Sequence, residues 1–218
     1  MQNPEEIFEA LKDNDIDKVD DYLNTHPQLI NHRAENGETL FLLTIYYGRN
    51  EIRELLLQKG YLPDHFEASA AGNLNRLKEL LDDNDQLIHT FSEDGFTALG
   101  LACFFGHVEA VKYLLSKGAE VNIRSSNTFR VMPLHSAVAN RNYEITKILL
   151  EHGAEVNARQ QQDITPLHQA ADHGELEMIR LLLKYNADRS LRTKSGLTPV
   201  DMARQRGHED AVDLLFQD

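Results

Sequence analysis

The sequence predicts an all-α solenoid in which helix-turn-helix units stack along one axis. Three observations support this prediction: a short block of residues recurs, each copy is followed by a turn and a Leu-rich run, and the copies are nearly evenly spaced. The block is most complete at 165–170, where it is Thr-Pro-Leu-His-Gln-Ala. A chain built from one repeating unit makes contacts mainly between neighbouring units, and such chains usually offer extended binding surfaces.

Three further copies of the block carry substitutions. They are Thr-Ala-Leu-Gly-Leu-Ala at 97–102, Met-Pro-Leu-His-Ser-Ala at 132–137 and Thr-Pro-Val-Asp-Met-Ala at 198–203. A hydroxyl followed by proline suits a helix start, because the hydroxyl caps the first turn and proline tolerates the first helical position. Each copy therefore predicts the first helix of a unit.

A small or polar residue marks the turn between the two helices of each unit. The markers are Asn14, Gly48, Gly72, Gly106, Arg141, Gly174 and Gly207, at intervals of 34, 24, 34, 35, 33 and 33 residues. After five of these markers, apolar residues three and four apart predict a second helix with one apolar face. Gly118 and Gly153 stand where two of these helices should end, as left-handed caps.

The pattern resembles the ankyrin-repeat family, whose unit of about 33 residues holds two antiparallel helices and a turn. The stretch 165–174 is close to a complete family motif, and the resemblance covers nearly the whole chain. It implies short β-turn fingers between units and a structural role for Thr165, Pro166, His135 and His168. It implies one domain over 1–218, with seven units at about 3–35, 36–63, 64–94, 95–129, 130–162, 163–195 and 196–218.

Composition narrows the classes of partner and compartment. The net charge of −13 argues against nucleic acid or an anionic membrane as the main partner. The N-terminal residues lack a signal-peptide pattern, so we expect a cytoplasmic protein, with export by a signal-independent route as the alternative. The single cysteine, Cys103, takes a small-residue position of the repeat and is expected to be buried in a reducing compartment.

The sequence offers no pattern typical of catalysis or metal binding. The ten histidines and one cysteine do not have the spacing of a zinc site. Phosphate-binding loops, nucleophile elbows and dinucleotide-binding motifs are lacking as well. We therefore expect no enzymatic activity, no cofactor and no metal. An enzyme whose site residues are dispersed along the chain is the alternative.

Irregular positions of a repeat are where function is best sought. The spacing between the second and third units is nine residues short of 33, which leaves no room for a finger before Phe66. The finger before Met132 is instead two residues longer than its counterpart in the next unit, and it carries Phe129 and Arg130.

Two aromatic doublets, at 46–47 and 104–105, flank an alanine pair at 70–71. In the ankyrin family these positions face solvent on the concave side. Aromatic side chains exposed together are costly unless they bind something, so we predict a partner-binding groove over units two to four. The alternative is that the rings pack on neighbouring helices. The candidate contacts, which include the same position of the sixth unit, are Tyr46, Tyr47, Phe104, Phe105, Phe129, Arg130, Asp172 and His173.

The function predicted from these features is a non-catalytic scaffold, an adaptor or an inhibitor. It should bind a protein partner through its concave helix face and fingers, as a monomer. A bacterial effector or immunity protein that acts on a specific enzyme or host protein is the alternative, and a homo-oligomer formed through the same groove is another. Asn122 and Asn157 resemble targets of asparaginyl hydroxylase in this family, although a turn-bridging role explains them more simply.

Overall fold

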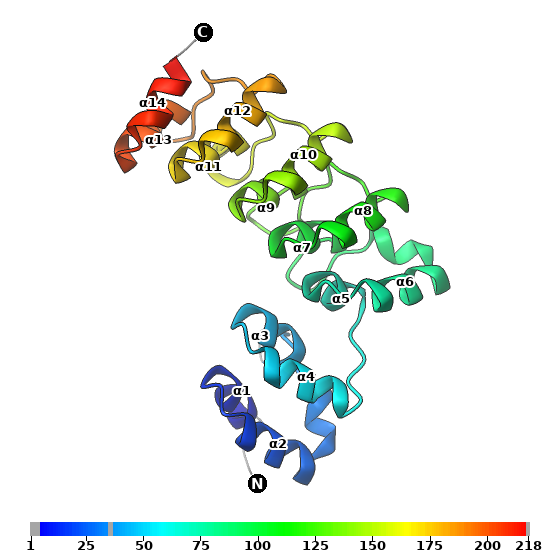
Figure 1. Ribbon diagram of the computed structural model, residues 1–218. Helices are drawn as coiled ribbons and strands as arrows, with labels where there is room; N and C mark the ends of the chain where they lie inside the picture. The colour runs from blue at the N-terminus through cyan, green and yellow to red at the C-terminus, as the bar shows by residue number, and fades with distance from the viewer. Residues whose placement is uncertain (1–4, 35–36, 217–218) are drawn as a thin grey trace.

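The computed structural model describes residues 5–34 and 37–216 (Figure 1). Over these residues the protein is a stack of helix pairs without a β-strand, and one isolated antiparallel bridge joins Arg33 and Thr39. The predicted all-α solenoid is confirmed. The predicted unit boundary between residues 35 and 36, and the outermost limits at 3 and 218, lie outside the described residues.

The helices form two layers, with the odd-numbered helices in one and the even-numbered helices in the other (Figure 1). The first layer contains α1 (Glu5–Lys12), α3 (Leu40–Tyr46), α5 (His65–Ala71), α7 (Ala98–Phe105), α9 (Pro133–Ala139), α11 (Pro166–His173) and α13 (Pro199–Arg206). The second contains α2 (Ile16–Thr25), α4 (Asn50–Gln58), α6 (Leu74–Asp83), α8 (Val108–Ser116), α10 (Tyr143–Glu151), α12 (Leu176–Lys184) and α14 (Glu209–Phe216). Three short 3-10 helices are η1 (Pro27–Asn31), η2 (Asp85–His89) and η3 (Gln161–Asp163).

The recurring block builds the start of four first-layer helices, α7, α9, α11 and α13. At α11, the hydroxyl of Thr165 accepts a hydrogen bond from the backbone N–H of His168 at 3.4 Å, and Pro166 takes the first helical position. The helix ends at Gly174, whose φ of 67° is in the left-handed region that glycine accepts without strain. Local capping chemistry therefore sets both ends of this helix.

The motif histidines connect α9 and α11 to the loops beyond them. The Nε2 of His135 lies 3.1 Å from the carbonyl oxygen of Ala158, and the Nε2 of His168 lies 3.1 Å from that of Leu197. Burial lowers the pKa of both rings, that of His135 to about 4, so both are neutral at pH 7. A neutral ring donates from Nε2 and accepts a backbone N–H at Nδ1, which fixes its orientation.

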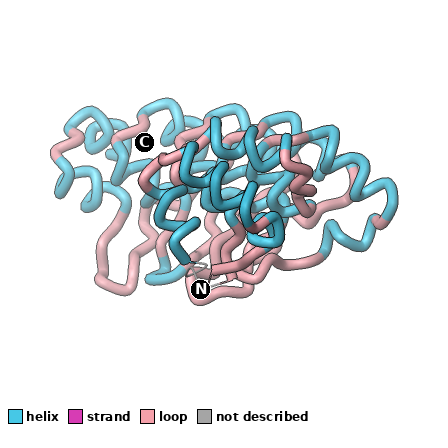
Figure 2. Tube along the Cα trace, turned by 90° about the horizontal axis from the view of Figure 1, so that it is seen from below, coloured by secondary structure: helices cyan, strands magenta, loops and turns pink. Residues whose placement is uncertain are grey.

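The fingers gather along one edge of the stack, where Figure 2 shows the long loops together. Backbone hydrogen bonds join successive fingers, from Ser126 to Gly95 at 2.8 Å, from Gln161 to Phe129 at 2.9 Å and from Lys194 to Gln162 at 2.9 Å. Asn122 and Asn157 add side-chain bridges, because each accepts a backbone N–H of the next unit through its Oδ1 at 2.8 Å. The fingers after α6 therefore support one another in series.

This series has a gap between the second and third helix pairs. Residues 59–64 run directly from α4 to α5, which confirms that the finger before Phe66 is missing. Tyr61 in this connection is buried and stacks on Phe41, with ring centroids 5.2 Å apart. The alanine pair of α5 corrects one prediction: Ala70 is fully buried and Ala71 half-buried, because these small side chains let neighbouring elements approach α5 closely. The carbonyl of Ala70, for example, accepts the His107 ring at 2.9 Å.

Candidate partner-binding groove

One ring of each aromatic doublet lies in an apolar groove between the first-layer helices and the fingers. Tyr46 at the end of α3 and Phe104 in α7 both line it, whereas Tyr47 and Phe105 do not. Consecutive helical residues point about 100° apart, so only one ring of each pair can face the groove. Phe105 is half-buried and packs with its centroid 5.7 Å from the Tyr46 ring, while Tyr47 is exposed elsewhere.

The groove has a volume of about 300 Å³ and extends from α3 to α11. Its lining residues are Tyr46, Phe96, Gly100, Leu101, Phe104, Phe129, Val131, His135, Ser136, Ala139, Gln160 and Gln169. None of them is charged at neutral pH, since the pKa of the buried His135 is lowered to about 4. Phe104 is 47% exposed and Phe129 is 54% exposed, so large apolar surfaces face solvent here.

Gly100 explains why the groove opens at α7. It occupies the third position of its helix, where α9 and α11 carry the motif histidines. A Cβ built at Gly100 would come within 3.3 Å of the Thr97 hydroxyl and of no other neighbour inside 4 Å. The missing side chain therefore leaves space beside Phe104. Sequence reasoning missed this residue, although a glycine in place of the motif histidine was a visible signal.

Gln169 was also missed, and it gives the groove a polar side chain two helix pairs beyond Phe104. Its Oε1 is buried and has no hydrogen-bond partner within the described residues. The carboxamide therefore has hydrogen-bonding capacity that the protein itself does not use. Nothing in the repeat pattern marked this position.

The remaining candidates lie outside the groove. Arg130 follows Phe129 on the long finger, with a left-handed backbone at φ 53°, and its side chain does not line the cavity. Asp172 and His173 are at the end of α11. Asp172 accepts two hydrogen bonds from the Arg206 guanidinium, at 2.7 and 3.3 Å, so its carboxylate is held by the neighbouring unit.

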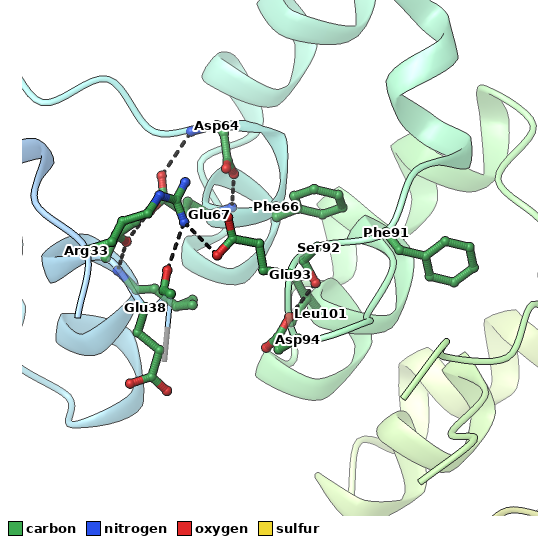
Figure 3. Close-up of a pocket in the computed structure, with 13 residues that line it drawn as sticks. Arg33, Glu38, Asp64, Phe66, Glu67, Phe91, Ser92, Glu93, Asp94 and Leu101 are labelled. Carbon is green, nitrogen blue, oxygen red and sulfur yellow. Dashed lines mark hydrogen bonds and ion pairs between the residues drawn. The ribbon is translucent and has the colours of Figure 1, made fainter. Parts of the chain in front are cut away.

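A second hollow, of about 220 Å³, occupies the place of the missing finger (Figure 3). Arg33 and Glu93 approach from the fingers on either side and form an ion pair at 3.3 Å. Glu67 of α5 points into this region and is only 4% exposed. Its carboxylate accepts hydrogen bonds from the Thr39 hydroxyl, from the Tyr61 hydroxyl at 2.8 Å and from the backbone N–H of Asp64 at 3.0 Å. Burial raises the pKa of Glu67 above its ordinary value.

Comparison with known proteins identifies the family. A family model described as ankyrin repeats matches in three copies, over residues 3–125, 65–160 and 134–218. The chain belongs to the ankyrin-repeat family. Its motif histidines, hydroxyl caps and fingers thus follow the ankyrin-repeat pattern, and the missing finger is a departure from its 33-residue spacing.

Several proteins with ankyrin-type sequences are similar to parts of this ankyrin chain. It is 37% identical over 86 residues to the human transient receptor potential cation channel subfamily A member 1, covering 39% of this chain and 8% of the channel. It is 28% identical over 157 residues to the probable 26S proteasome regulatory subunit p28 of Saccharomyces cerevisiae, covering 66% and 68%. It is 36% identical over 87 residues to the human DNA-binding protein RFXANK, covering 40% and 33%. The match therefore spans only a small part of the channel and a third of RFXANK.

In the part of the chain that the structure describes, the helices are too short or too polar to span a membrane. The same residues contain no group of three or more His, Cys, Asp or Glu side chains placed to hold a metal ion.

Proposed function

We propose that this ankyrin-repeat protein is a non-catalytic binding module, an adaptor or an inhibitor, that takes an uncharged apolar segment of a partner protein into the groove. Ankyrin repeats generally mediate protein–protein interaction. The observation that carries the proposal is the exposure of Tyr46, Phe104 and Phe129 around one groove without charged lining residues.

The chemistry of the groove favours an apolar occupant. Aromatic side chains in a concave, uncharged site are typical hot spots, because their burial against a partner removes apolar surface from water. Covering one such ring contributes about 1.5–3 kcal/mol when burial is complete. A charged occupant would lose its hydration without gaining a counter-charge from the lining residues. The unused hydrogen-bonding capacity of Gln169 supplies a polar anchor at one end.

Similarity to the yeast p28 protein supports a role in binding a larger protein assembly, since that relative is named as a regulatory subunit of the 26S proteasome. The proposal for this chain is limited to the class of partner, a folded or extended protein with an exposed apolar segment.

A matched pair of variants tests the groove. Phe104 and Tyr47 are equally exposed, at 47% and 46%, but only Phe104 lines the groove. The partner is first isolated by affinity capture from the native lysate, and its affinity for each variant is then measured by calorimetry. Phe104→Ser should weaken binding by about tenfold or more, which is the effect of removing a modest hot spot. Tyr47→Ser should bind like the wild type. Equal affinity of both variants for the same partner would contradict the proposal.

A further inference from the structure

The apolar core of the protein is divided at the missing finger. One cluster of buried apolar residues lies in α1–α4 and the connection that follows, from Ile7 to Tyr61. The other lies in α5–α14, from Ala68 to Leu215. The clusters share no buried residue, and Ala71 is the partly buried residue of α5 that packs on the first cluster. We call residues 5–58 the N-terminal block and residues 65–216 the C-terminal block.

The second helix layer is interrupted at the same place. Consecutive helices of this layer pack on each other from α6 to α14, and α2 packs on α4, but α4 and α6 have at most marginal contact. In Figure 1 the α3–α4 pair stands apart from the α5–α6 pair along the stack, and the segment 59–64 connects them. The junction between the blocks therefore depends on α3 and α5.

Besides the apolar packing of Ala71 on the first cluster, α5 makes a polar contact across the junction through Glu67. Glu67 holds the third position of α5, which in α9 and α11 belongs to the motif histidines. Those histidines bond forward to the loop that follows their own helix pair, whereas Glu67 accepts from Thr39, the cap of α3 in the preceding unit. In α9 and α11 the residue at this position is a histidine that bonds to the following loop. In α5 it is a glutamate that bonds across the junction instead. The net contribution of a hydrogen bond to a charged group is well below its strength without water, because water solvates the same groups when the contact opens.

Further ties cross the junction on the finger side, in the part of the chain that the structure describes. Arg33 pairs with Glu93 at 3.3 Å, but both side chains are about half-exposed or more, so this ion pair is weak. Tyr46 donates a hydrogen bond to Asp94 at 3.1 Å and packs against Phe105. Among the described residues the buried apolar clusters on the two sides are separate, and such a junction is a site where the stack can open locally.

The groove crosses this junction. Of the residues that the structure describes, Tyr46 is its one lining residue from the N-terminal block, and the other lining residues, including Phe104 and Phe129, belong to the C-terminal block. A segment that contacts Tyr46 and Phe104 together can do so only while the blocks are docked. Such a segment binds the docked state more tightly and therefore shifts the population toward it.

We propose that the junction between α3 and α5 is a hinge at which the N-terminal block opens from the C-terminal block, and that a partner segment in the groove keeps the blocks docked. The first half of this inference is independent of the proposed function, and the second half rests on it. The hinge makes binding to the groove sensitive to any change that loosens the bonds around Glu67.

Distances between spin labels on either side of the junction test the hinge. One pair, Glu54→Cys in α4 and Asn75→Cys in α6, spans the junction, and a second pair, Asn75→Cys and Glu109→Cys in α8, lies within the C-terminal block. The native Cys103 is fully buried and should remain unlabelled. Pulsed electron resonance should give a broad distance distribution with a long-distance population for the first pair and a narrow distribution for the second.

Two variants at the junction sharpen the test. Tyr61→Phe removes one hydroxyl that donates to Glu67 and keeps the ring that stacks on Phe41, so it should at least double the long-distance population. Thr39→Ser keeps its hydroxyl and should leave that population unchanged. A narrow distribution for the junction pair that Tyr61→Phe does not alter would overturn the hinge, whatever the groove binds.

Nile red, an uncharged fluorescent probe, tests the coupling to the groove. Its fluorescence should rise on binding to wild type and not to Phe104→Ser, and its binding should reduce the long-distance population of the junction pair. A bound, Phe104-dependent probe that leaves the distances unchanged would overturn the coupling while leaving the proposed function standing. Binding that is unaffected by Phe104→Ser would overturn the coupling and count against the groove itself.

Discussion

The hydroxyl of Tyr46 donates a hydrogen bond to the carboxylate of Asp94 at 3.1 Å, across 48 residues of sequence. The bond joins the last residue of α3 to the first finger after the gap in the finger series. Tyr46 also lines the groove, so the same side chain forms part of the binding surface and of the junction between the blocks. Changes to its hydroxyl and to its ring should therefore have different effects.

Tyr46→Phe should separate these two roles. It removes the bond to Asp94 and keeps the ring beside Phe105 and in the groove. We expect the free energy of unfolding, measured by urea titration, to fall by about 0.5–1 kcal/mol, the usual net value of one hydrogen bond. Partner affinity should change much less than in Tyr46→Ala, which removes the ring as well. A loss of affinity as large in Tyr46→Phe as in Tyr46→Ala would show that the hydroxyl, rather than the ring, contacts the partner.

The buried motif histidine should make the protein acid-sensitive. Burial lowers the pKa of His135 from 6.5 to about 4, so the unfolded chain takes up this proton at higher pH than the folded chain does. The stabilising effect of the neutral ring is complete above pH 6.5 and is lost as the pH falls toward 4. The difference amounts to about 3 kcal/mol at 1.36 kcal/mol per pH unit.

Urea titrations from pH 7.5 to pH 4 check this expectation. His135→Gln should be less stable than wild type at pH 7.5, because it loses a buried ring that bonds to Ala158. Its stability should decline less steeply between pH 6.5 and pH 4. Parallel curves for the two proteins would mean that His135 does not contribute to the acid response.

The carboxyl of Glu67 should have the opposite dependence on pH. Burial is the main cause that raises the pKa of Glu67 above 4.5, so the unfolded carboxyl ionises before the folded one. Deprotonation then favours the unfolded state as the pH rises from 4.5 through the raised pKa. Glu67→Gln, measured by the same titrations, should therefore gain stability relative to wild type over that interval and keep a constant difference above it. A difference that does not vary with pH would contradict the raised pKa.

Two glycines with the same backbone conformation test the finger series. Gly95 and Gly196 have φ values of 84° and 83°, so an alanine is strained at both. A Cβ at Gly95 would also come within 2.7 Å of the Ser126 hydroxyl oxygen and 2.8 Å of the Asn127 backbone nitrogen, whereas at Gly196 it meets nothing within 4 Å.

We expect Gly196→Ala to cost about 1 kcal/mol from strain alone, and Gly95→Ala to cost more because the next finger must also move. Thermal and urea unfolding of both variants measure the difference. Since that finger carries Phe129, Gly95→Ala should also weaken binding to the groove, and Gly196→Ala should not. If both variants lose the same free energy of unfolding, the neighbouring finger moves aside without an energetic penalty.

The architecture could be predicted from the sequence because each unit carries its own start and stop signals. Thr165, Pro166 and Gly174 act locally, so their effect does not depend on distant residues. The shortened spacing before Phe66 likewise revealed the missing finger, since counting residues needs no tertiary information.

The site was only partly predictable because it depends on helix rotation and on contacts between units. The doublet at 104–105 indicated a groove, but only the rotation of α7 decides that Phe104 faces it and Phe105 packs beside it. Ala70 lies at a position expected to face solvent and is buried by its neighbours. Glu67 looks like an ordinary capping residue of α5, and its bond to Thr39 appears only when the two units are placed together.

The burial of Cys103 in α7 has a practical consequence. Its side chain is fully inaccessible and burial raises the pKa of the thiol, so a thiol reagent cannot reach a reactive thiolate in the folded C-terminal block. The sequence contains no other cysteine, so any reaction with a thiol reagent reports on Cys103 alone. The rate at which a thiol reagent labels Cys103 would measure how often the C-terminal block opens around α7. Opening of the first two helix pairs at the hinge would not raise this rate.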